Sequence, residues 1–261
     1  MILEFFSITD TGRARRNNED AVALDEPGGV AVLADGMGGY NAGEVASQMA
    51  SVRVRDELGQ RLKALGHDAT DLEIKSAMFD AVEAANHEVY NAALTTAEYA
   101  GMGTTLVVAI FRNERLWLGH IGDSRAYRFR AGHLEQLTRD HSLLQEQIDA
   151  GLITAEQAAY SMHKNLVTRA VGVDDLVELE IHDHPVEPGD LLLLCSDGLS
   201  DMLTDDQIAQ LLRSNDSLEA AGAMLIQAAN TAGGRDNIAV ILARAKPGSG
   251  GFGRSWWSFW R

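Results

Sequence analysis

Residues 104–137 read TTLVVAIFRNERLWLGHIGDSRAYRFRAGHLEQL, and this stretch indicates the fold. It contains short runs of apolar and β-branched residues at 104–111, 115–121, 125–130 and 133–137. The links Arg112-Asn113-Glu114 and Arg130-Ala131-Gly132 are short enough to be hairpin turns. Strands joined by hairpins run antiparallel, so the stretch predicts part of an antiparallel sheet.

Further strands and helices are predicted on both sides of this stretch. The strands are expected at 2–9, 20–24, 30–34, 177–182, 190–195 and 238–243. Apolar residues at three- and four-residue spacing predict helices over 43–62, 71–97, 205–213 and 217–231. Strands and helices therefore arrive in blocks, which argues against a parallel βαβ sheet. We expect an α+β fold in which two antiparallel β-sheets pack as a sandwich flanked by helices.

Two segments differ in composition from the body of the chain. Residues 141–175 mix short helical pieces with polar residues, and we expect a flap-like surface excursion there. The stretch 246–261 begins rich in Gly and Ser and finishes WWSFWR. We therefore expect one domain over 1–245 followed by a flexible linker with an aromatic end. The aromatic residues of 254–261 either fold onto that domain or contact a partner or a membrane surface.

Composition and charge exclude several classes of protein. The 261 residues include 38 Asp and Glu against 22 Lys and Arg, a net charge of −16, whereas nucleic-acid binders present basic surfaces. A hydrophobic content of 46% is typical of a folded chain. The single cysteine, Cys195, forms no internal disulfide, and no apolar run approaches the ~20 residues of a membrane span. We expect a cytoplasmic protein without a membrane span and without nucleic-acid partners.

Four aspartates stand where a predicted buried strand meets a loop. Asp35, Asp123 and Asp197 each follow an apolar run, and Asp236 precedes the last strand. A carboxylate in such a place is costly unless its charge is compensated. If the strand ends converge, an oxygen-only cluster suits Mg²⁺ or Mn²⁺. Ordinary turn chemistry is the alternative for any one of them, but four together favour a site.

Other catalytic signatures are incomplete in this sequence. Cys195 lacks the arginine six positions later that a cysteine phosphatase needs, because Asp201 stands there. It also lies in an apolar strand, where we expect it to be buried and inert. His87-Glu88 has Asn91 where a zincin has its second histidine, and no G-x-S-x-G elbow occurs. Cysteine, zinc-protease and serine-hydrolase mechanisms are therefore excluded.

A set of ordered motifs resembles the metal-dependent serine/threonine protein phosphatases, the PPM or type 2C family, and in particular their compact bacterial members. The motifs are RRNNED at 15–20, ADGMGG at 34–39 with GEVAS at 43–47, GTT at 103–105, IGDSR at 121–125, LTRDH at 137–141, VTRAVG at 167–172, CSDGL at 195–199 and GGRDN at 233–237. Each is weak alone, but the ordered set covers nearly the whole chain. The resemblance implies an α-β-β-α sandwich with a metal centre at one edge and makes 1–245 the catalytic domain.

The resemblance also implies which residues hold the metal ions. Asp35 would bridge two ions, and the carbonyl oxygen of Gly36 would be a ligand of one. Asp197 and Asp236 would complete the coordination of the other. Asp123 would bind a third, weaker ion that it shares with Asp197.

Three residues near the N-terminus complete the implied site. Glu19 and Asp20 would hold metal-bound waters, and Arg15 matches the arginine that binds the substrate phosphate. A guanidinium group can hold two phosphate oxygens in its fork. Arg13 and Arg16 compete for this role, and the spacing of five residues before Asp20 favours Arg15.

The implied reaction is hydrolysis of phosphoserine and phosphothreonine in proteins, reversing a bacterial serine/threonine kinase. Two Mn²⁺ or Mg²⁺ ions would neutralise the phosphate charge and lower the pKa of a bridging water toward about 7, so that a metal-bound hydroxide attacks phosphorus. Phosphorylated proteins and a kinase are the expected partners of a monomer. The alternative is a catalytically weak phosphatase-fold module with a regulatory or phospho-binding role, although the full set of metal ligands argues against it.

The proton donor for the leaving oxygen has two candidates. Animal members of the family carry a histidine where Met37 stands, and many bacterial relatives carry one where Tyr40 stands. The phenol of Tyr40, with an ordinary pKa near 10, or a water on the third metal ion would serve instead. His141 and His163 have no partner that the sequence identifies, so we expect ordinary surface histidines there.

Overall fold

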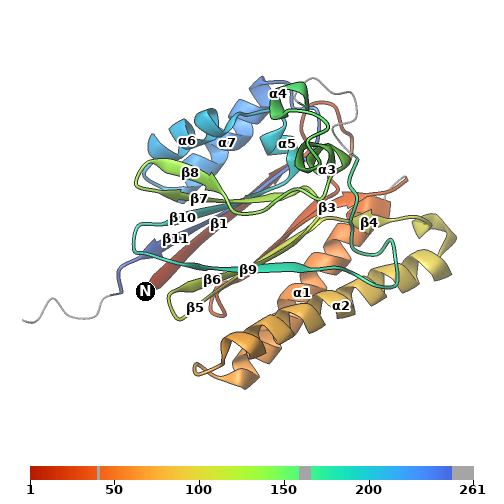
Figure 1. Cartoon of the computed structure of the whole chain (residues 1–261), viewed down its shortest axis with the longest axis horizontal. Coiled ribbons are helices and arrows are strands. Elements are labelled where there is room, and N and C mark those ends of the chain that lie inside the picture. Colours follow the sequence, from red (N-terminus) through yellow and green to blue (C-terminus); the bar gives the residue numbers. More distant parts are fainter. Residues whose placement is uncertain (40–41, 159–165, 249–261) are drawn as a thin grey trace, which may run out of the picture.

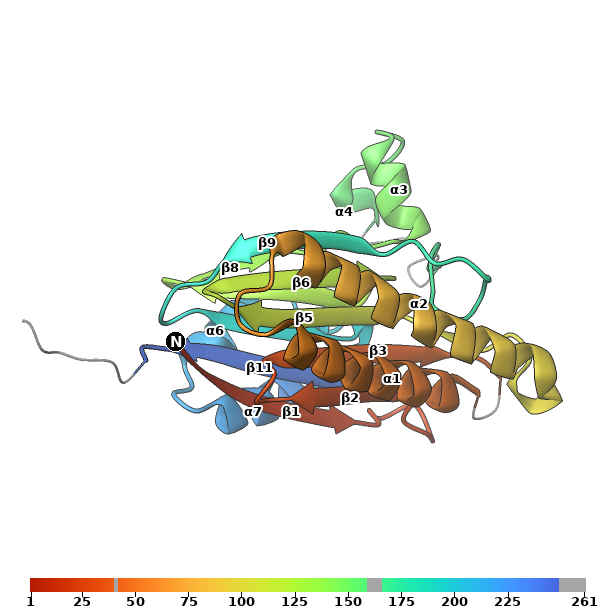
Figure 2. The same ribbon diagram turned by 90° about the horizontal axis from the view of Figure 1, so that it is seen from below.

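Two β-sheets lie face to face, and helices cover the outer face of each sheet (Figure 1). The structure, a computed structural model, describes residues 1–39, 42–158 and 166–248. The view turned by 90° shows α1 and α2 crossing the outer face of one sheet (Figure 2). The predicted sandwich flanked by helices is therefore confirmed.

Every neighbouring pair of strands within the two sheets is antiparallel. The first sheet has the order β1-β11-β10-β7-β8 and the second the order β2-β3-β5-β6-β9, with β4 paired to β3. The first sheet contains β1 (Ile2–Asp10), β7 (Arg125–Arg130), β8 (His133–Gln136), β10 (Leu191–Cys195) and β11 (Ile238–Lys246). The second contains β2 (Asp20–Asp25), β3 (Val30–Met37), β4 (Gly103–Thr104), β5 (Leu106–Arg112), β6 (Arg115–Ile121) and β9 (Glu180–Pro185).

Three apolar layers hold these elements together. Between the sheets, Leu33 and Leu118 of one sheet pack with Leu194 and Ile241 of the other, and all four are buried. Because side chains alternate along a strand, the opposite face of each sheet packs against helices. Burial of a leucine or isoleucine side chain is worth about 1.5–3 kcal/mol, so these layers supply most of the stabilisation.

The helices fall into two groups on opposite sides of the sandwich. The group over the second sheet consists of α1 (Ala42–Leu65) and α2 (Asp71–Thr95), followed by the 3₁₀ turn η1 (Ala97–Tyr99). The group over the first sheet consists of α5 (Asp197–Ser200), α6 (Asp205–Arg213) and α7 (Leu218–Thr231). Helix α2 begins sharply because Thr70 and Glu73 form a capping box.

Among the predicted strands, β3 and β11 run three residues further than expected, so that β3 includes Asp35, and two others are displaced or divided. The strand expected at 177–182 is β9, which begins at Glu180. Residues 177–179 before it join no strand ladder, and Val177 and Leu179 instead pack their side chains against the buried cluster beneath α1 and α2. The strand expected at 104–111 is divided into β4 and β5 at Thr105, whose N–H turns to donate to the carbonyl oxygen of Asp35 at 2.8 Å.

The segment expected to be a flap carries two short helices. These are α3 (Leu143–Asp149) and α4 (Ala155–Ala158), which stand away from the sandwich (Figure 2). The predictions for 159–165 and for the aromatic residues of 254–261 lie outside the described residues. Among the helices that the structure describes, none is long and apolar enough to cross a membrane.

Candidate active site

Elements of both sheets bring four aspartates to one edge of the sandwich. Asp35 lies near the end of β3, Asp123 follows β6, Asp197 begins α5 after β10, and Asp236 stands just before β11. All four line one pocket of about 210 Å³, together with Gly36. The convergence that the strand ends suggested is present, and the role of these residues as metal ligands stays a prediction.

Arg15 reaches the same pocket from the loop between β1 and β2. Its Nη2 donates to Oδ2 of Asp236 at 2.7 Å, and 52% of its side chain is exposed. Asn237 holds this loop in place, because its Oδ1 accepts from the N–H of Glu19 and its Nδ2 donates to the carbonyl oxygen of Asn17, both at 2.8 Å. The segment that precedes β11 therefore carries an aspartate of the pocket and also positions Arg15.

Glu19 and Asp20 lie at different depths. Glu19 lines the pocket, whereas Asp20 lies behind it and is only 8% exposed. One carboxylate oxygen of Asp20 accepts from Ser196 Oγ at 2.7 Å, and the other is buried without a partner among the described residues. A buried oxygen of this kind has capacity for a further donor, such as a water on a cation.

Burial raises the pKa of several carboxyl groups at the pocket. It raises the pKa of Asp20 to about 7 and that of Asp123 to about 6. The pKa values of Asp35 and Asp197 also lie well above the ordinary value, because of burial first and neighbouring carboxylates second. Such crowded negative charge needs compensation. The candidate metal-ligand atoms of these residues are all oxygen atoms, so the residues fit hard divalent cations such as Mn²⁺ and Mg²⁺.

Two glycines allow the segments that carry the carboxylates to touch through their backbones. A Cβ at Gly198 would lie 1.9 Å from the carbonyl oxygen of Asn237, and a Cβ at Gly36 would lie 2.0 Å from that of Gly43. No other residue fits in either place without displacing backbone. The start of α5 is therefore fixed against the segment before β11, and the end of β3 is fixed against the start of α1.

Hydroxyl groups link the aspartates beneath the pocket. The N–H of Asp35 donates to Thr105 Oγ1 at 3.0 Å, and Thr105 Oγ1 shares a hydrogen bond with Ser124 Oγ at 2.7 Å. Ser196 contacts an aspartate side chain instead, because its Oγ donates to the carboxylate of Asp20. Sequence reasoning assigned no role to these hydroxyls, although Thr105, Ser124 and Ser196 all lie within the ordered motifs.

Comparison with known proteins identifies the family. The family model described as Protein phosphatase 2C matches residues 11–243. The chain belongs to the protein phosphatase 2C family. The serine/threonine phosphatase stp of Listeria monocytogenes is 38% identical to this phosphatase over 239 residues, 90% of this chain and 92% of that relative. The serine/threonine protein phosphatase PstP of Mycobacterium tuberculosis is 37% identical over 246 residues, 93% of this chain and 45% of PstP.

Solved structures agree with this assignment. The serine/threonine phosphatase of S. agalactiae superposes with a TM-score of 0.86 at 35% identity and covers 94% of this chain and 100% of its own. The catalytic domain of PstP in complex with two manganese ions superposes with a TM-score of 0.81 at 36% identity and covers 94% of this chain and 99% of its own. The resemblance drawn from the motifs is confirmed, and the enzyme is a type 2C serine/threonine phosphatase of bacterial type.

The prediction that His141 is a surface histidine is wrong. The side chain is 7% exposed and stacks on His120, with the ring centroids 4.6 Å apart. It contacts Gly122 and Glu180, which belong to segments far from it in sequence, so nothing in the local sequence revealed its burial. His163 lies outside the described residues.

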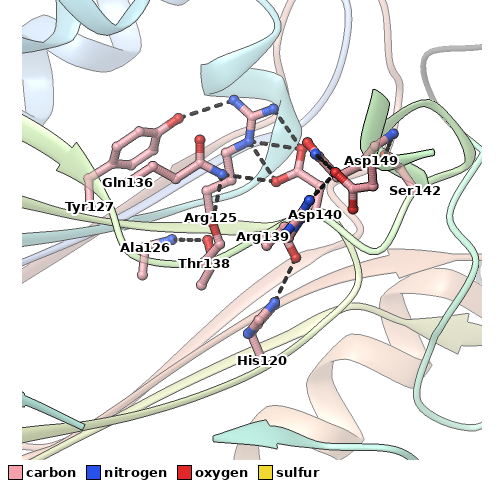
Figure 3. Close-up of polar contacts among 11 residues, drawn as sticks. His120, Arg125, Ala126, Tyr127, Gln136, Thr138, Arg139, Asp140, Ser142 and Asp149 are labelled. Carbon is pink, nitrogen blue, oxygen red and sulfur yellow. Dashed lines mark hydrogen bonds and ion pairs between the residues drawn. The ribbon is translucent and has the colours of Figure 1, made fainter. Parts of the chain in front are cut away.

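A second arginine–aspartate pair supports the phosphatase beside the pocket (Figure 3). Arg125 donates to Asp140 through Nε at 2.9 Å and Nη2 at 2.6 Å, and through Nη1 to the hydroxyl oxygen of Tyr127 at 3.1 Å. Gln136 Nε2 also donates to Asp140 at 3.1 Å. This pair lines a cavity of about 340 Å³ that adjoins the pocket and lies against α3. It holds the segment that leads from β8 into the flap.

The sulfur-bearing side chains at the site offer no catalytic proton. Cys195 is buried as predicted, and burial raises the pKa of its thiol to about 12. Met37 lines the pocket with a thioether, which carries no acidic proton. The alternative donor Tyr40 lies outside the described residues of the phosphatase.

Proposed function

We propose that the phosphatase hydrolyses phosphoserine and phosphothreonine in proteins with a pair of bound divalent metal ions, and that it reverses the action of a bacterial serine/threonine kinase. The observation that carries this proposal is one pocket that contains Arg15 together with four aspartates. A cationic phosphate-binding group next to an anionic metal-binding group is what phosphoryl chemistry needs. The manganese ions in the related PstP structure support the choice of metal.

The carboxylates of the pocket would hold the ions. Asp35 and the carbonyl oxygen of Gly36 would act with Asp197 and Asp236 on a pair of Mn²⁺ or Mg²⁺ ions, and Asp123 would bind a third, weaker ion. When bound, such ions neutralise the charge of the phosphate ester and activate a water for attack on phosphorus. The raised pKa values of the buried aspartates support this assignment, because they report negative charge that lacks compensation.

Arg15 would bind the substrate phosphate, and Glu19 and Asp20 would orient water. The described contact of Arg15 with Asp236 uses a single nitrogen, so its guanidinium fork retains donors for two phosphate oxygens. Glu19 lines the pocket directly. Asp20 would act from behind through its unpartnered oxygen, which suits a water molecule on the metal side.

A catalytically weak phosphatase-fold module with a regulatory or phospho-binding role is the alternative function. It is disfavoured because every carboxylate expected for the metal centre is present in the pocket. We further propose that the enzyme acts as a monomer in the cytoplasm. The sequence contains a single cysteine, Cys195, and hence no internal disulfide, which supports a reducing compartment.

Metal-dependent turnover of a phosphothreonine peptide tests this proposal. The full chain, stripped of metal with a chelator, should be inactive and should regain activity with Mn²⁺ or Mg²⁺. Asp35→Asn should remove this activity, whereas Asp206→Asn, on the exposed face of α6, should leave it unchanged. Absence of turnover with either metal, or full activity in Asp35→Asn, would show that the proposal is wrong.

A further inference from the structure

Two hydrogen bonds join His141 to the turn that presents Asp123. The N–H of His141 donates to the carbonyl oxygen of Gly122 at 2.9 Å, and the N–H of Gly122 donates to Nδ1 of the His141 ring at 3.1 Å. Gly122 has a φ of +100°, and a Cβ there would lie 2.7 Å from Thr105 Cγ2. The turn therefore depends on glycine and on the partners that fix its two peptide groups.

The opposite side of the His141 ring is fixed by a carboxylate. Because the N–H of Gly122 only donates, Nδ1 carries a lone pair and the proton of the neutral ring is on Nε2. That nitrogen lies 3.2 Å from Oε2 of Glu180 in β9. The other carboxylate oxygen of Glu180, Oε1, lies 2.6 Å from Nε2 of His182. Burial acts to raise the pKa of Glu180, but the hydrogen bonds from His182 and His141 outweigh it and lower the pKa to about 2. An ionised Glu180 thus selects the required tautomer.

His120, His141 and Glu180 lie close enough to suggest a separate metal site, but their bonding argues against it. A metal ion on Nε2 of His141 would leave that ring without any proton while Nδ1 still accepts from Gly122. The rings of His120 and His141 are also nearly parallel, at 18°, so their in-plane lone pairs do not meet at one point. Their described contacts fit a structural role instead.

The place of His141 in the fold connects the turn to the flap. Its carbonyl oxygen accepts from the N–H of Thr168 at 2.8 Å, and the next residue, Ser142, forms a bridge with Val167. The two ends of the flap therefore meet at His141, directly behind the turn. The imidazole of His141 is hydrogen-bonded to the Asp123 turn on one side and to β9 on the other. The backbone of His141 joins the two ends of the flap.

We propose that His141 is a positioning residue for Asp123. It holds both peptide groups of Gly122, and thereby sets the direction in which the next residue presents its carboxylate to the pocket. This inference rests on the proposed function, in which Asp123 binds the weakest of the metal ions. Loss of the Nδ1 acceptor would leave a buried N–H of Gly122 unpaired and allow the turn to rotate.

Other contacts hold this segment, so His141 can be replaced without unfolding it. Asp140 is bound by the fork of Arg125, and the carbonyl oxygen of Arg139 accepts from His120 Nε2 at 2.8 Å (Figure 3). These contacts flank His141 on its N-terminal side, and neither hydrogen bond uses an atom of the His141 ring, although His120 stacks on it. Variants at this position should therefore report on the turn rather than on the folding of the segment.

Two amide substitutions separate the two sides of the ring. Asparagine places an oxygen near the position of Nδ1 and keeps the acceptor for Gly122, whereas glutamine places its amide near Nε2 and keeps only the contact with Glu180. His141→Gln should weaken the weakest Mn²⁺ site about tenfold, and His141→Asn should stay within about twofold of the wild type. Titration calorimetry of Mn²⁺ into the metal-free full chain measures this. His133→Gln, at an exposed position on β8, should match the wild type.

Asp123→Asn provides the reference in which the weakest site is lost. If that variant binds Mn²⁺ like the wild type, Asp123 is no ligand, and both its assignment and the role of His141 are wrong. If Asp123→Asn loses the weakest Mn²⁺ site while His141→Gln binds Mn²⁺ like the wild type, Asp123 is a ligand of the third ion but His141 does not position it. Equal losses in His141→Asn and His141→Gln would also overturn it, because the acceptor for Gly122 would then not matter.

Discussion

Two arginine–aspartate pairs of this phosphatase share their chemistry and differ in exposure. Arg15 meets Asp236 through one nitrogen, and their side chains are 52% and 26% exposed. Arg125 meets Asp140 through two nitrogens, and theirs are 27% and 11% exposed. An exposed single contact is worth about 0–1 kcal/mol, whereas breaking a buried pair costs about 3–5 kcal/mol. The first pair can therefore open for a phosphate, and the second cannot open without loss of structure.

The elements that carry the two arginines explain this difference. Arg15 lies in the loop between β1 and β2, whose backbone Asn237 holds while the arginine side chain projects into the exposed pocket. Arg125 begins β7 and pairs directly with Cys195 of the buried strand β10. The difference between the exposed arginine, proposed to bind phosphate, and the more enclosed arginine behind it thus comes from placement in the fold, not from residue type.

The largest effect is expected from removing the aspartate of the exposed pair. Asp236→Ala should lower phosphopeptide turnover by about 10³-fold or more, because the change removes a proposed metal ligand. The melting temperature of the metal-free variant should not fall, since one of several mutually repelling carboxylates is lost. Steady-state assays with Mn²⁺ and thermal melting measure both. A variant within tenfold of wild-type turnover would contradict the assignment of Asp236.

Removing the aspartate of the buried pair should affect stability instead. Asp140→Ala should lower the free energy of unfolding by about 3 kcal/mol, because the largely enclosed charge of Arg125 would lose the carboxylate that its Nε and Nη2 bind. Asp149→Ala is the matched control, since the Asp149–Arg139 pair is exposed to 35% and 61%. Its cost should be about 0.5 kcal/mol or less in denaturant unfolding. Equal losses of unfolding free energy in Asp140→Ala and Asp149→Ala would show that the Arg125–Asp140 pair stabilises the fold no more than an exposed pair does.

An intermediate effect is expected at the exposed arginine. Arg15→Ala should lower kcat/KM for a phosphothreonine peptide roughly 30-fold, equivalent to about 2 kcal/mol of lost charge-assisted hydrogen bonding. Its unfolding free energy should match that of the wild type, because the side chain is half exposed. Arg16→Ala, the neighbouring exposed arginine, is the control for loss of positive charge. If Arg16→Ala were the more damaging variant, the phosphate would be bound by the other arginine.

The smallest effect is a pH dependence of the metal-free protein. The pKa values of Asp20 and Asp123, about 7 and about 6 in the folded state, exceed the usual value of 3.8 expected when unfolded. The folded state therefore binds more protons between about pH 4 and 7, and its stability should fall as pH rises through this window. The single charge of Arg15 does not compensate all the carboxylates of the pocket, whereas Arg125 compensates the one carboxylate of Asp140.

Thermal melting in chelator at pH 5.5 and 7.5 measures this dependence. The melting temperature should be a few degrees higher at pH 5.5, and Asp20→Asn should reduce the difference. Saturating Mn²⁺ should reverse its sign, because cations bind the deprotonated carboxylates. If the melting temperature differed between the two pH values by the same amount in the wild type and in Asp20→Asn, the proton uptake would occur at other groups.

Local patterns in the sequence predicted the layers of the fold and the acidic part of the pocket. The helix expected at 205–213 is α6 with the same bounds, because its apolar spacing is regular and Thr204 caps it. The aspartates were found because a charge after a buried strand is conspicuous. His141 and the Arg125–Asp140 pair were not found, since their partners lie in other elements and tertiary contacts alone define them.

The contact between Gly198 and the backbone of Asn237 determines how the proposed metal centre responds to local opening. Since no side chain separates the two segments, Asp197 and Asp236 part only if β10 separates from β11, and these strands lie in the buried core. Backbone amides beside both residues should therefore exchange hydrogen for deuterium only through global unfolding. Amides of α3, outside the sandwich, should exchange through local opening. Local opening of α3 would therefore leave the spacing of the two carboxylates unchanged.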